Sequence, residues 1–94
     1  MIKRFVKLTF KPEHIQDFIT LFNSNKELIG SVEGCSHLEL LQDTDNQCVF
    51  FTFSIWQNTE YIEQYRNSDL FKGIWARTKK LFADKPEAWS LEVF

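Results

Sequence analysis

The stretch CSHLELLQDTDNQCVFFTFSIW, from Cys35 to Trp56, contains two runs of strand-forming residues separated by turn-forming residues. The first run is Cys35–Gln42, and the second is Gln47–Trp56, which is rich in β-branched and aromatic side chains. Such runs are typical of β-strands. The sequence DTDN at positions 43–46 is typical of a turn. The stretch therefore predicts an antiparallel β-hairpin, and the rest of the fold is predicted outward from it.

A loop made of residues 43–46 sets the predicted register of this hairpin, with Gln42 opposite Gln47 and Cys35 opposite Ser54. One predicted face is uniformly apolar and carries Leu38, Leu40, Val49, Phe51, Phe53 and Ile55. The other face is mixed and carries Cys35, His37, Glu39, Leu41, Cys48, Phe50, Thr52, Ser54 and Trp56. We expect helices to cover the apolar face, and a second sheet from a second subunit to pack on the mixed face.

The cysteines and histidines predict neither a disulfide nor a metal site. Cys35 and Cys48 would lie roughly 20 Å apart along the predicted strands, which is too far for a disulfide within one chain. No pair of histidines has the spacing of metal ligands, and no Cys-x-x-Cys motif occurs. We therefore expect no metal.

The segments on either side of the hairpin show strand and helix patterns in alternation. Before it, Ile2–Phe10 predicts a strand, and Pro12 begins a helix whose apolar residues recur at helical spacing as far as Ile29. After it, Asn58–Tyr65 predicts a short helix capped by Asn58, and a second helical piece begins at Ser68. The second helix is therefore predicted to be split.

The last segment, Ala88–Phe94, alternates in the manner of a strand and completes the order strand, helix, strand, strand, helix, strand. This order predicts an α+β, ferredoxin-like βαββαβ fold with an antiparallel four-stranded sheet and helices on one face. We expect residues 1–94 to form a single domain.

The composition excludes several classes of protein. Ten Phe, three Trp and two Tyr are a heavy aromatic load for 94 residues, so part of this surface is expected to face a ligand or a second subunit. The net charge is −2, and no basic stripe is present, which argues against nucleic-acid binding. An RNA-recognition domain shares the element order, but residues 47–56 contain neither Gly nor Lys. No apolar run suits a signal peptide or a membrane span, so a cytoplasmic protein is expected.

Two stretches together resemble a known family. They are EGCSHLELLQ, residues 33–42, and FTFSIWQNTEYIEQYRNSDLFKGIW, residues 51–75. A Gly-Cys pair opens one strand, a Trp closes the next, and a short helix leads to Ser68, a hydrophobic residue and Phe71. This order of features resembles the antibiotic biosynthesis monooxygenase family of dimeric α/β-barrel proteins. The resemblance implies a homodimer.

The resemblance also implies an activity. Family members of the quinol-oxidising type use no metal, flavin or other cofactor, and they oxygenate a small hydroxylated aromatic or quinol-type substrate. The implied pocket lies between the helix-covered face of the sheet and the split helix. The side chains expected to bind a small aromatic substrate there are Phe51, Phe53, Tyr65, Phe71 and Trp75.

Tyr65 and His37 are the two candidate catalytic residues. The Tyr65 hydroxyl could donate a hydrogen bond to a substrate oxygen, and His37 could transfer a proton near neutral pH. Many relatives have histidines where this chain has Tyr65 and Leu70. The haem-degrading branch of the family pairs an Asn with a Trp and a His, at places that align with Val6, Tyr65 and Trp75. Haem degradation is therefore disfavoured, since Trp is no axial ligand.

The enzyme interpretation has one alternative. The same aromatic pocket could belong to a non-catalytic dimeric α/β-barrel protein that binds a small ligand or serves in a stress response. Oxygen uptake with hydroquinones or polycyclic phenols would separate the two interpretations.

Overall fold

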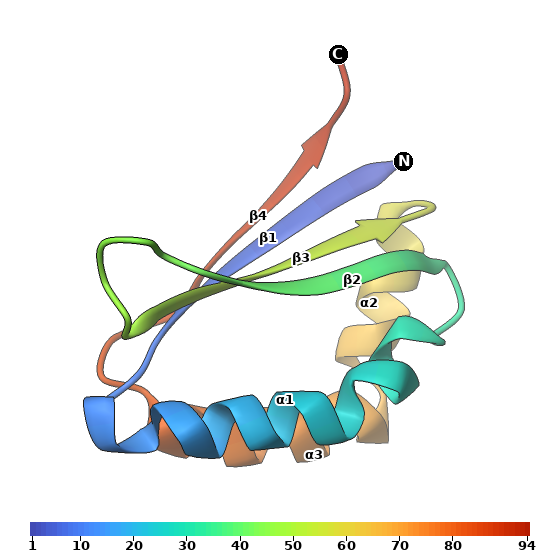
Figure 1. The fold of residues 1–94 in the computed structure, drawn as a ribbon. Helices are drawn as coiled ribbons and strands as arrows, with labels where there is room; N and C mark the ends of the chain where they lie inside the picture. Colours follow the sequence, from blue (N-terminus) through green and yellow to red (C-terminus); the bar gives the residue numbers. More distant parts are fainter.

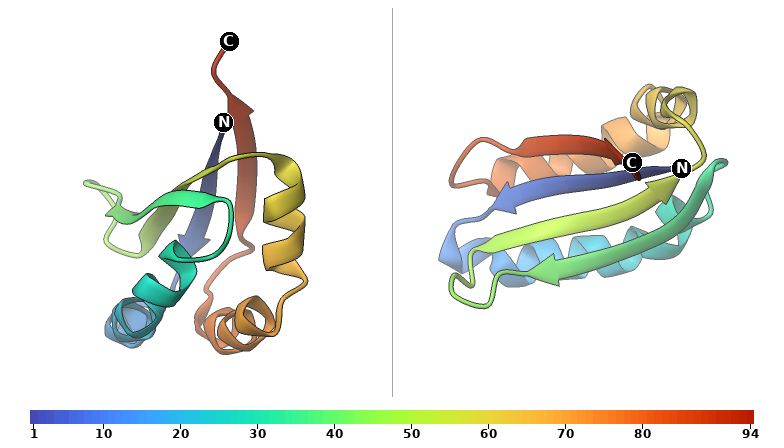
Figure 2. Two further views of the ribbon diagram at one scale, coloured as in Figure 1. Left: turned by 90° about the vertical axis from the view of Figure 1, so that its right-hand side faces the viewer. Right: turned by 90° about the horizontal axis from the view of Figure 1, so that it is seen from above.

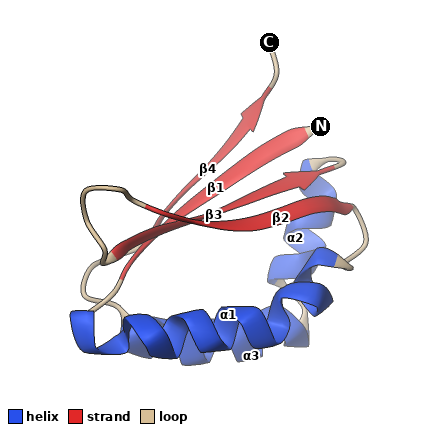
Figure 3. Cartoon of the chain, viewed as in Figure 1, coloured by secondary structure: helices blue, strands red, loops and turns tan.

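The computed structural model describes residues 1–94 and consists of one four-stranded antiparallel sheet with helices on one side (Figures 1 and 3). The strand order across the sheet is β2-β3-β1-β4. The elements in chain order are β1 Ile2–Thr9, α1 Ile15–Gly30, β2 Cys35–Gln42, β3 Val49–Trp56, α2 Thr59–Arg66, α3 Asp69–Thr78 and β4 Glu87–Glu92. Short 3-10 turns at Pro12–His14 and Lys79–Leu81 flank α1 and α3. The predicted ferredoxin-like fold is confirmed.

The split of the second helix follows from two capping side chains. Asn58 begins α2 by accepting a hydrogen bond from the backbone N–H of Tyr61 at 3.2 Å, as predicted. Ser68 caps α3 by accepting one from the backbone N–H of Phe71 at 3.2 Å, and its hydroxyl donates to the carbonyl oxygen of Tyr65. One serine therefore ends α2 and begins α3, which lets the chain turn between them (Figure 2).

The predicted register of the β2–β3 hairpin is wrong. Gln42 lies opposite Phe50 instead of Gln47, and Leu38 lies opposite Ser54. Asp43 and Asn46 each accept a hydrogen bond from a backbone N–H two residues later, so the loop runs on to Cys48 and β3 begins at Val49. The register moves by an odd number of residues, and this turns every β3 side chain to the opposite face from the one predicted.

The main core lies between the sheet and α1. Its buried members are Leu8, Phe10, Phe18, Phe22 and Phe50. The Phe10 and Phe18 rings stack with centroids 4.1 Å apart, and Phe50 meets both rings edge-on. A smaller cluster of Ile2, Trp56 and Ile62 holds α2 against the end of the sheet.

A tight turn between α1 and β2 positions α2. Gly34 has a φ of 87°, and a Cβ placed there would lie 2.3 Å from Cγ of Tyr61. The Gly34 carbonyl accepts a hydrogen bond from the N–H of Gln57 at 2.8 Å. A glycine is required here both for the backbone conformation and for the close approach of the α2 ring.

The face of the sheet away from the helices is bare (Figure 2, right). We call it the open face; its outward side chains from the four strands are Lys3, Phe5, Lys7, His37, Glu39, Leu41, Phe51, Phe53, Ile55, Glu87, Trp89 and Leu91. Phe5 and Phe53 stack on it with ring centroids 4.8 Å apart. Leu41, Trp89 and Leu91 are 41%, 41% and 51% exposed. On β3, the open face therefore carries Phe51, Phe53 and Ile55, which the sequence placed on the helix-covered face.

Both cysteines are free. None of the helices combines the length and the apolar character that a membrane-spanning helix requires.

Candidate functional site

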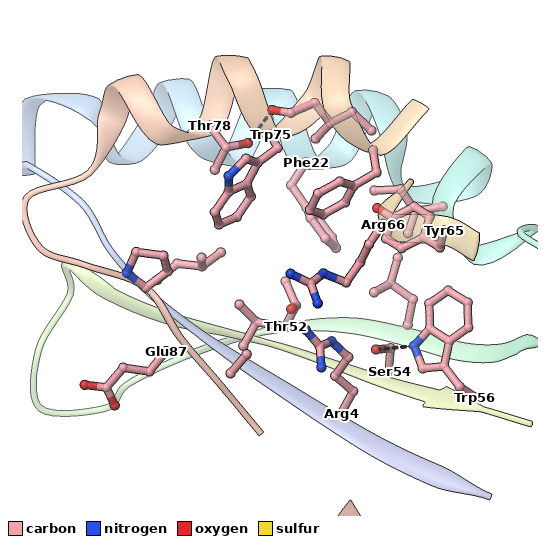
Figure 4. A pocket seen from close by; sticks show the side chains of 18 of the residues that line it. Arg4, Phe22, Thr52, Ser54, Trp56, Tyr65, Arg66, Trp75, Thr78 and Glu87 are labelled. Carbon is pink, nitrogen blue, oxygen red and sulfur yellow. Dashed lines mark hydrogen bonds between the residues drawn. The ribbon is translucent and has the colours of Figure 1, made fainter. Parts of the chain in front are cut away.

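A cavity of about 330 Å³ lies between the helix-covered face of the sheet and the helices (Figure 4). Twelve of its 19 lining residues are hydrophobic. The sheet contributes the floor and the helices the roof. The lining includes Arg4, Val6, Thr52, Ser54, Trp56, Tyr65, Arg66, Phe71, Trp75, Thr78 and Glu87.

Small side chains on β3 make room for this cavity. Thr52 and Ser54 point toward the helices, between the much larger Phe50 and Trp56. The strand alternation therefore places two short side chains where a phenylalanine on each position would fill the space. Apolar cavities of this size, with a few polar groups, are typical of small-molecule sites.

Four aromatic rings form a row along one wall. Trp56 and Tyr65 have centroids 5.4 Å apart, Tyr65 meets Phe71 edge-on at 5.2 Å, and Phe71 stacks on Trp75 at 5.6 Å. The row runs from the end of β3 across α2 to α3. Such a wall offers flat aromatic ligands both face and edge contacts.

Some of the polar side chains that line the cavity are already hydrogen-bonded within the chain. The indole N–H of Trp56 donates to Oγ of Ser54 at 2.9 Å, and the Thr78 hydroxyl donates to the Ile74 carbonyl at 2.8 Å. These bonds orient the side chains that line the cavity, while the Ser54 hydroxyl keeps its proton as a donor and the Thr78 hydroxyl keeps its acceptor capacity.

Tyr65 is the phenol of the cavity, and no hydrogen bond within the chain uses its hydroxyl. Burial raises the pKa of Tyr65 to about 12, and the negative charge of the nearby Cys35 thiolate adds to the rise. The phenol therefore stays protonated at neutral pH. It can donate a hydrogen bond to a ligand oxygen, but it is a poor general base.

Arg4 and Arg66 bring positive charge to the cavity. Arg4 projects from β1 between apolar neighbours, and Arg66 is the last residue of α2. Sequence reasoning missed Arg4. The available signal was a charged residue on the same strand face as Ile2, Val6 and Leu8.

The structure brings together three of the five predicted substrate-binding residues. Tyr65, Phe71 and Trp75 line the cavity. The predicted placement of Phe51 and Phe53 beside them is wrong, because the register of the hairpin turns both rings to the open face. Trp56, which the predicted register assigned to the mixed face, lines the cavity instead.

His37 does not lie near Tyr65. It projects from the open face, where its ring lies 5.5 Å from that of Phe53 and its Nε2 lies 3.6 Å from a carboxylate oxygen of Glu39. The sheet separates it from the cavity. The two candidate catalytic residues therefore belong to opposite faces.

The donor set of the cavity does not fit haem. No histidine, cysteine or methionine lines it, so Tyr65 is the one side chain of a type that ligates haem iron. Ligation requires the tyrosinate, which the raised pKa of Tyr65 disfavours. No three His, Cys, Asp or Glu side chains are grouped so as to hold a metal ion.

Known proteins share both sequence and fold with this chain. A family model described as antibiotic biosynthesis monooxygenase matches residues 1–77. A conserved protein from Methanosarcina mazei Go1 is 26% identical, with a TM-score of 0.90 over 96% of this chain and 89% of that one. A solved antibiotic biosynthesis monooxygenase is 15% identical, with a TM-score of 0.93 over 100% of this chain and 99% of that one.

A curated protein of Natronomonas pharaonis, whose name proposes that it binds haem, is 26% identical over 78 residues. The match covers 83% of this chain, and the chain spans 13% of the length of that relative.

Proposed function

This chain belongs to the antibiotic biosynthesis monooxygenase family, and from that premise we propose that it oxygenates a small hydroxylated aromatic, quinol-type substrate without a cofactor. The observation that carries the proposal is the cavity under the split helix, whose aromatic row includes Tyr65 with a hydroxyl that makes no hydrogen bond within the chain. The row would hold the substrate ring, and the phenol would donate a hydrogen bond to its oxygen.

In the proposed reaction the ionised substrate passes an electron to dioxygen, and the two radicals combine at a ring carbon. Loss of water then leaves one oxygen atom on the substrate, which supplies both hydrogens of that water. The protein would orient the substrate, exclude solvent and stabilise the negative charge on its oxygen. Tyr65 serves the last role as a donor, because its raised pKa keeps the proton on the phenol.

The test is oxygen uptake by the purified protein in air, with a panel of hydroquinones and polycyclic phenols. The assay contains a metal chelator and no flavin or haem. Turnover that falls on filling the cavity, in Thr52→Phe, supports the proposal. Absence of turnover across the panel contradicts it.

A second candidate function is binding without turnover. It is favoured by the absence of any histidine in the cavity lining and by the poor basicity of Tyr65. Quenching of the fluorescence of Trp56 and Trp75 by the same phenols, without oxygen uptake, would support this alternative.

We also propose that a second copy of the chain covers the open face. Proteins of this family are typically dimeric. The open face exposes a contiguous apolar surface on all four strands, which a monomer rarely leaves in water. Sedimentation at micromolar concentration should show twice the chain mass of 11.2 kDa. A species of the single-chain mass would contradict the proposal.

A further inference from the structure

Two guanidinium groups enter the cavity from opposite sides. Arg4 rises from β1 on the floor, and Arg66 reaches down from the end of α2 (Figure 4). Their charged ends point toward one another in the middle of the lining. The Tyr65, Phe71 and Trp75 rings of the aromatic row line the same cavity.

Neither arginine has a strong anionic partner in the chain. Arg4 donates to the neutral hydroxyl of Ser90 at 2.8 Å and forms no ion pair. Arg66 lies 3.5 Å from a carboxylate oxygen of Glu63, but the two side chains are 52% and 64% exposed. Such an exposed pair contributes little.

The surroundings penalise the charge on Arg4. Desolvation by burial lowers its pKa first, and the nearby Arg66 lowers it further, while Glu63 acts in the opposite direction. A negative group between the two guanidinium groups would relieve both effects. Glu87 is the one acidic residue in the lining, but its side chain belongs to the open face and points away from the arginines (Figure 4).

We propose that Arg4 and Arg66 form an anion subsite that binds one carboxylate or phenolate group of an otherwise apolar, aromatic ligand. The planar guanidinium fork matches such oxygens, and the aromatic row accepts the rest of the molecule. The inference rests on the same cavity as the proposed function and names the charge of its ligand. The shared chemistry is an oxyanion attached to an aromatic ring.

The test compares matched probes by equilibrium binding, followed by the fluorescence of the cavity tryptophans and by calorimetry. Naphthoate carries a carboxylate, and naphthamide is its neutral counterpart. Naphthol supplies a phenolate, naphtholate, when the pH is above the pKa of naphthol. Naphthoate should bind at least tenfold more tightly than naphthamide, because hydrogen bonds to charged groups exceed neutral ones. Added salt should weaken the binding of the anionic probes and leave the binding of naphthamide unchanged.

Arg4→Gln and Arg66→Gln should each raise the Kd of naphthoate roughly tenfold and leave that of naphthamide unchanged. Arg77→Gln is the matched control, because Arg77 is an exposed α3 arginine outside the cavity lining. Its Kd values should equal those of the parent protein. The order of naphthoate and naphtholate distinguishes a carboxylate from a phenolate as the preferred group.

Equal binding of naphthamide and both anionic probes, binding of none of the three probes, or equal losses for the anionic and the neutral probes in the arginine variants would overturn the subsite. The binding assay is independent of oxygen uptake. Charge-selective binding without turnover would support the subsite and contradict the proposed reaction. Turnover without charge-selective binding would support the reaction and overturn the subsite.

Discussion

The two faces of the sheet differ in the size of the side chains that β3 presents on them. On the helix-covered face, β3 presents Thr52 and Ser54 between larger neighbours, and the short side chains leave a cavity. On the open face the same strand presents Phe51, Phe53 and Ile55, which form a flat apolar surface. The more apolar half of β3 therefore points away from the helices, so apolarity alone does not identify the inner face of a sheet.

The largest expected effect concerns the open face. Phe53→Glu combined with Trp89→Glu places two carboxylates where a second copy is proposed to pack. The dimer Kd should rise by a hundredfold or more, since truncating central aromatic anchors costs about 2–4 kcal/mol each. Sedimentation over a concentration series measures it. Ligand binding in the cavity should change less than the dimer Kd, and an unchanged dimer Kd would remove the open face as the interface.

The next largest expected effect is a loss of folding stability at alkaline pH, which comes from Tyr65 on the helix-covered side of the sheet. The folded-state pKa of Tyr65, about 12, lies above the ordinary value of 10. The folded chain therefore holds this proton more tightly than the unfolded chain. Its stability contribution is fully present below pH 10 and is lost as the pH rises toward 12. The loss should approach about 2–3 kcal/mol.

Denaturant unfolding between pH 9 and 12 measures this loss. Tyr65→Phe should reduce the alkaline loss of stability, whereas the matched control Tyr61→Phe should retain it. Equal alkaline slopes in both variants would show that the Tyr65 phenol does not titrate as its burial requires.

Filling the cavity should change ligand binding on the helix-covered face without changing association through the open face. Thr52→Phe places a ring in the space between the sheet and the helices, so the Kd of aromatic probes should rise at least tenfold. Fluorescence titration measures this change, and sedimentation should show an unaltered oligomer. Phe51→Leu, one residue earlier on the open face, is the control that should keep probe affinity. Full affinity in Thr52→Phe would place the ligand elsewhere.

The smallest expected effect is on turnover. Tyr65→Phe keeps the ring and removes the donor, so kcat for the proposed oxygenation should fall on the order of tenfold, with KM little changed. Steady-state oxygen uptake measures both constants. An unchanged kcat would remove the Tyr65 hydroxyl from the mechanism.

Local signals predicted the elements well. The bounds of β2 and the Asn58 and Ser68 caps were all read from short stretches of sequence and are confirmed. These features depend on propensities and on hydrogen bonds within a few residues, which the sequence displays directly. The family resemblance, rather than any local pattern, implied that Tyr65, Phe71 and Trp75 share a pocket, and all three line the cavity.

The site was harder to predict wherever it depended on the register of the hairpin. Two side-chain hydrogen bonds in the loop, from Asp43 and Asn46, lengthen the turn and exchange the faces of β3. Phe51 and Phe53 leave the predicted pocket, and Trp56 enters it. Arg4 could not be predicted as a site residue, because its proposed role depends on Arg66, which lies 62 positions away in the sequence.

The sequence alone determined the order of strands and helices, the break at Ser68 and the family, because these follow from periodicity, capping and motif order along the chain. Only the tertiary structure decided which side chains share the cavity and which face solvent. The physical reason is that strand side chains alternate with a period of two. A small change in the pairing of β2 with β3 therefore leaves every local pattern intact and still exchanges the inside and the outside of a strand.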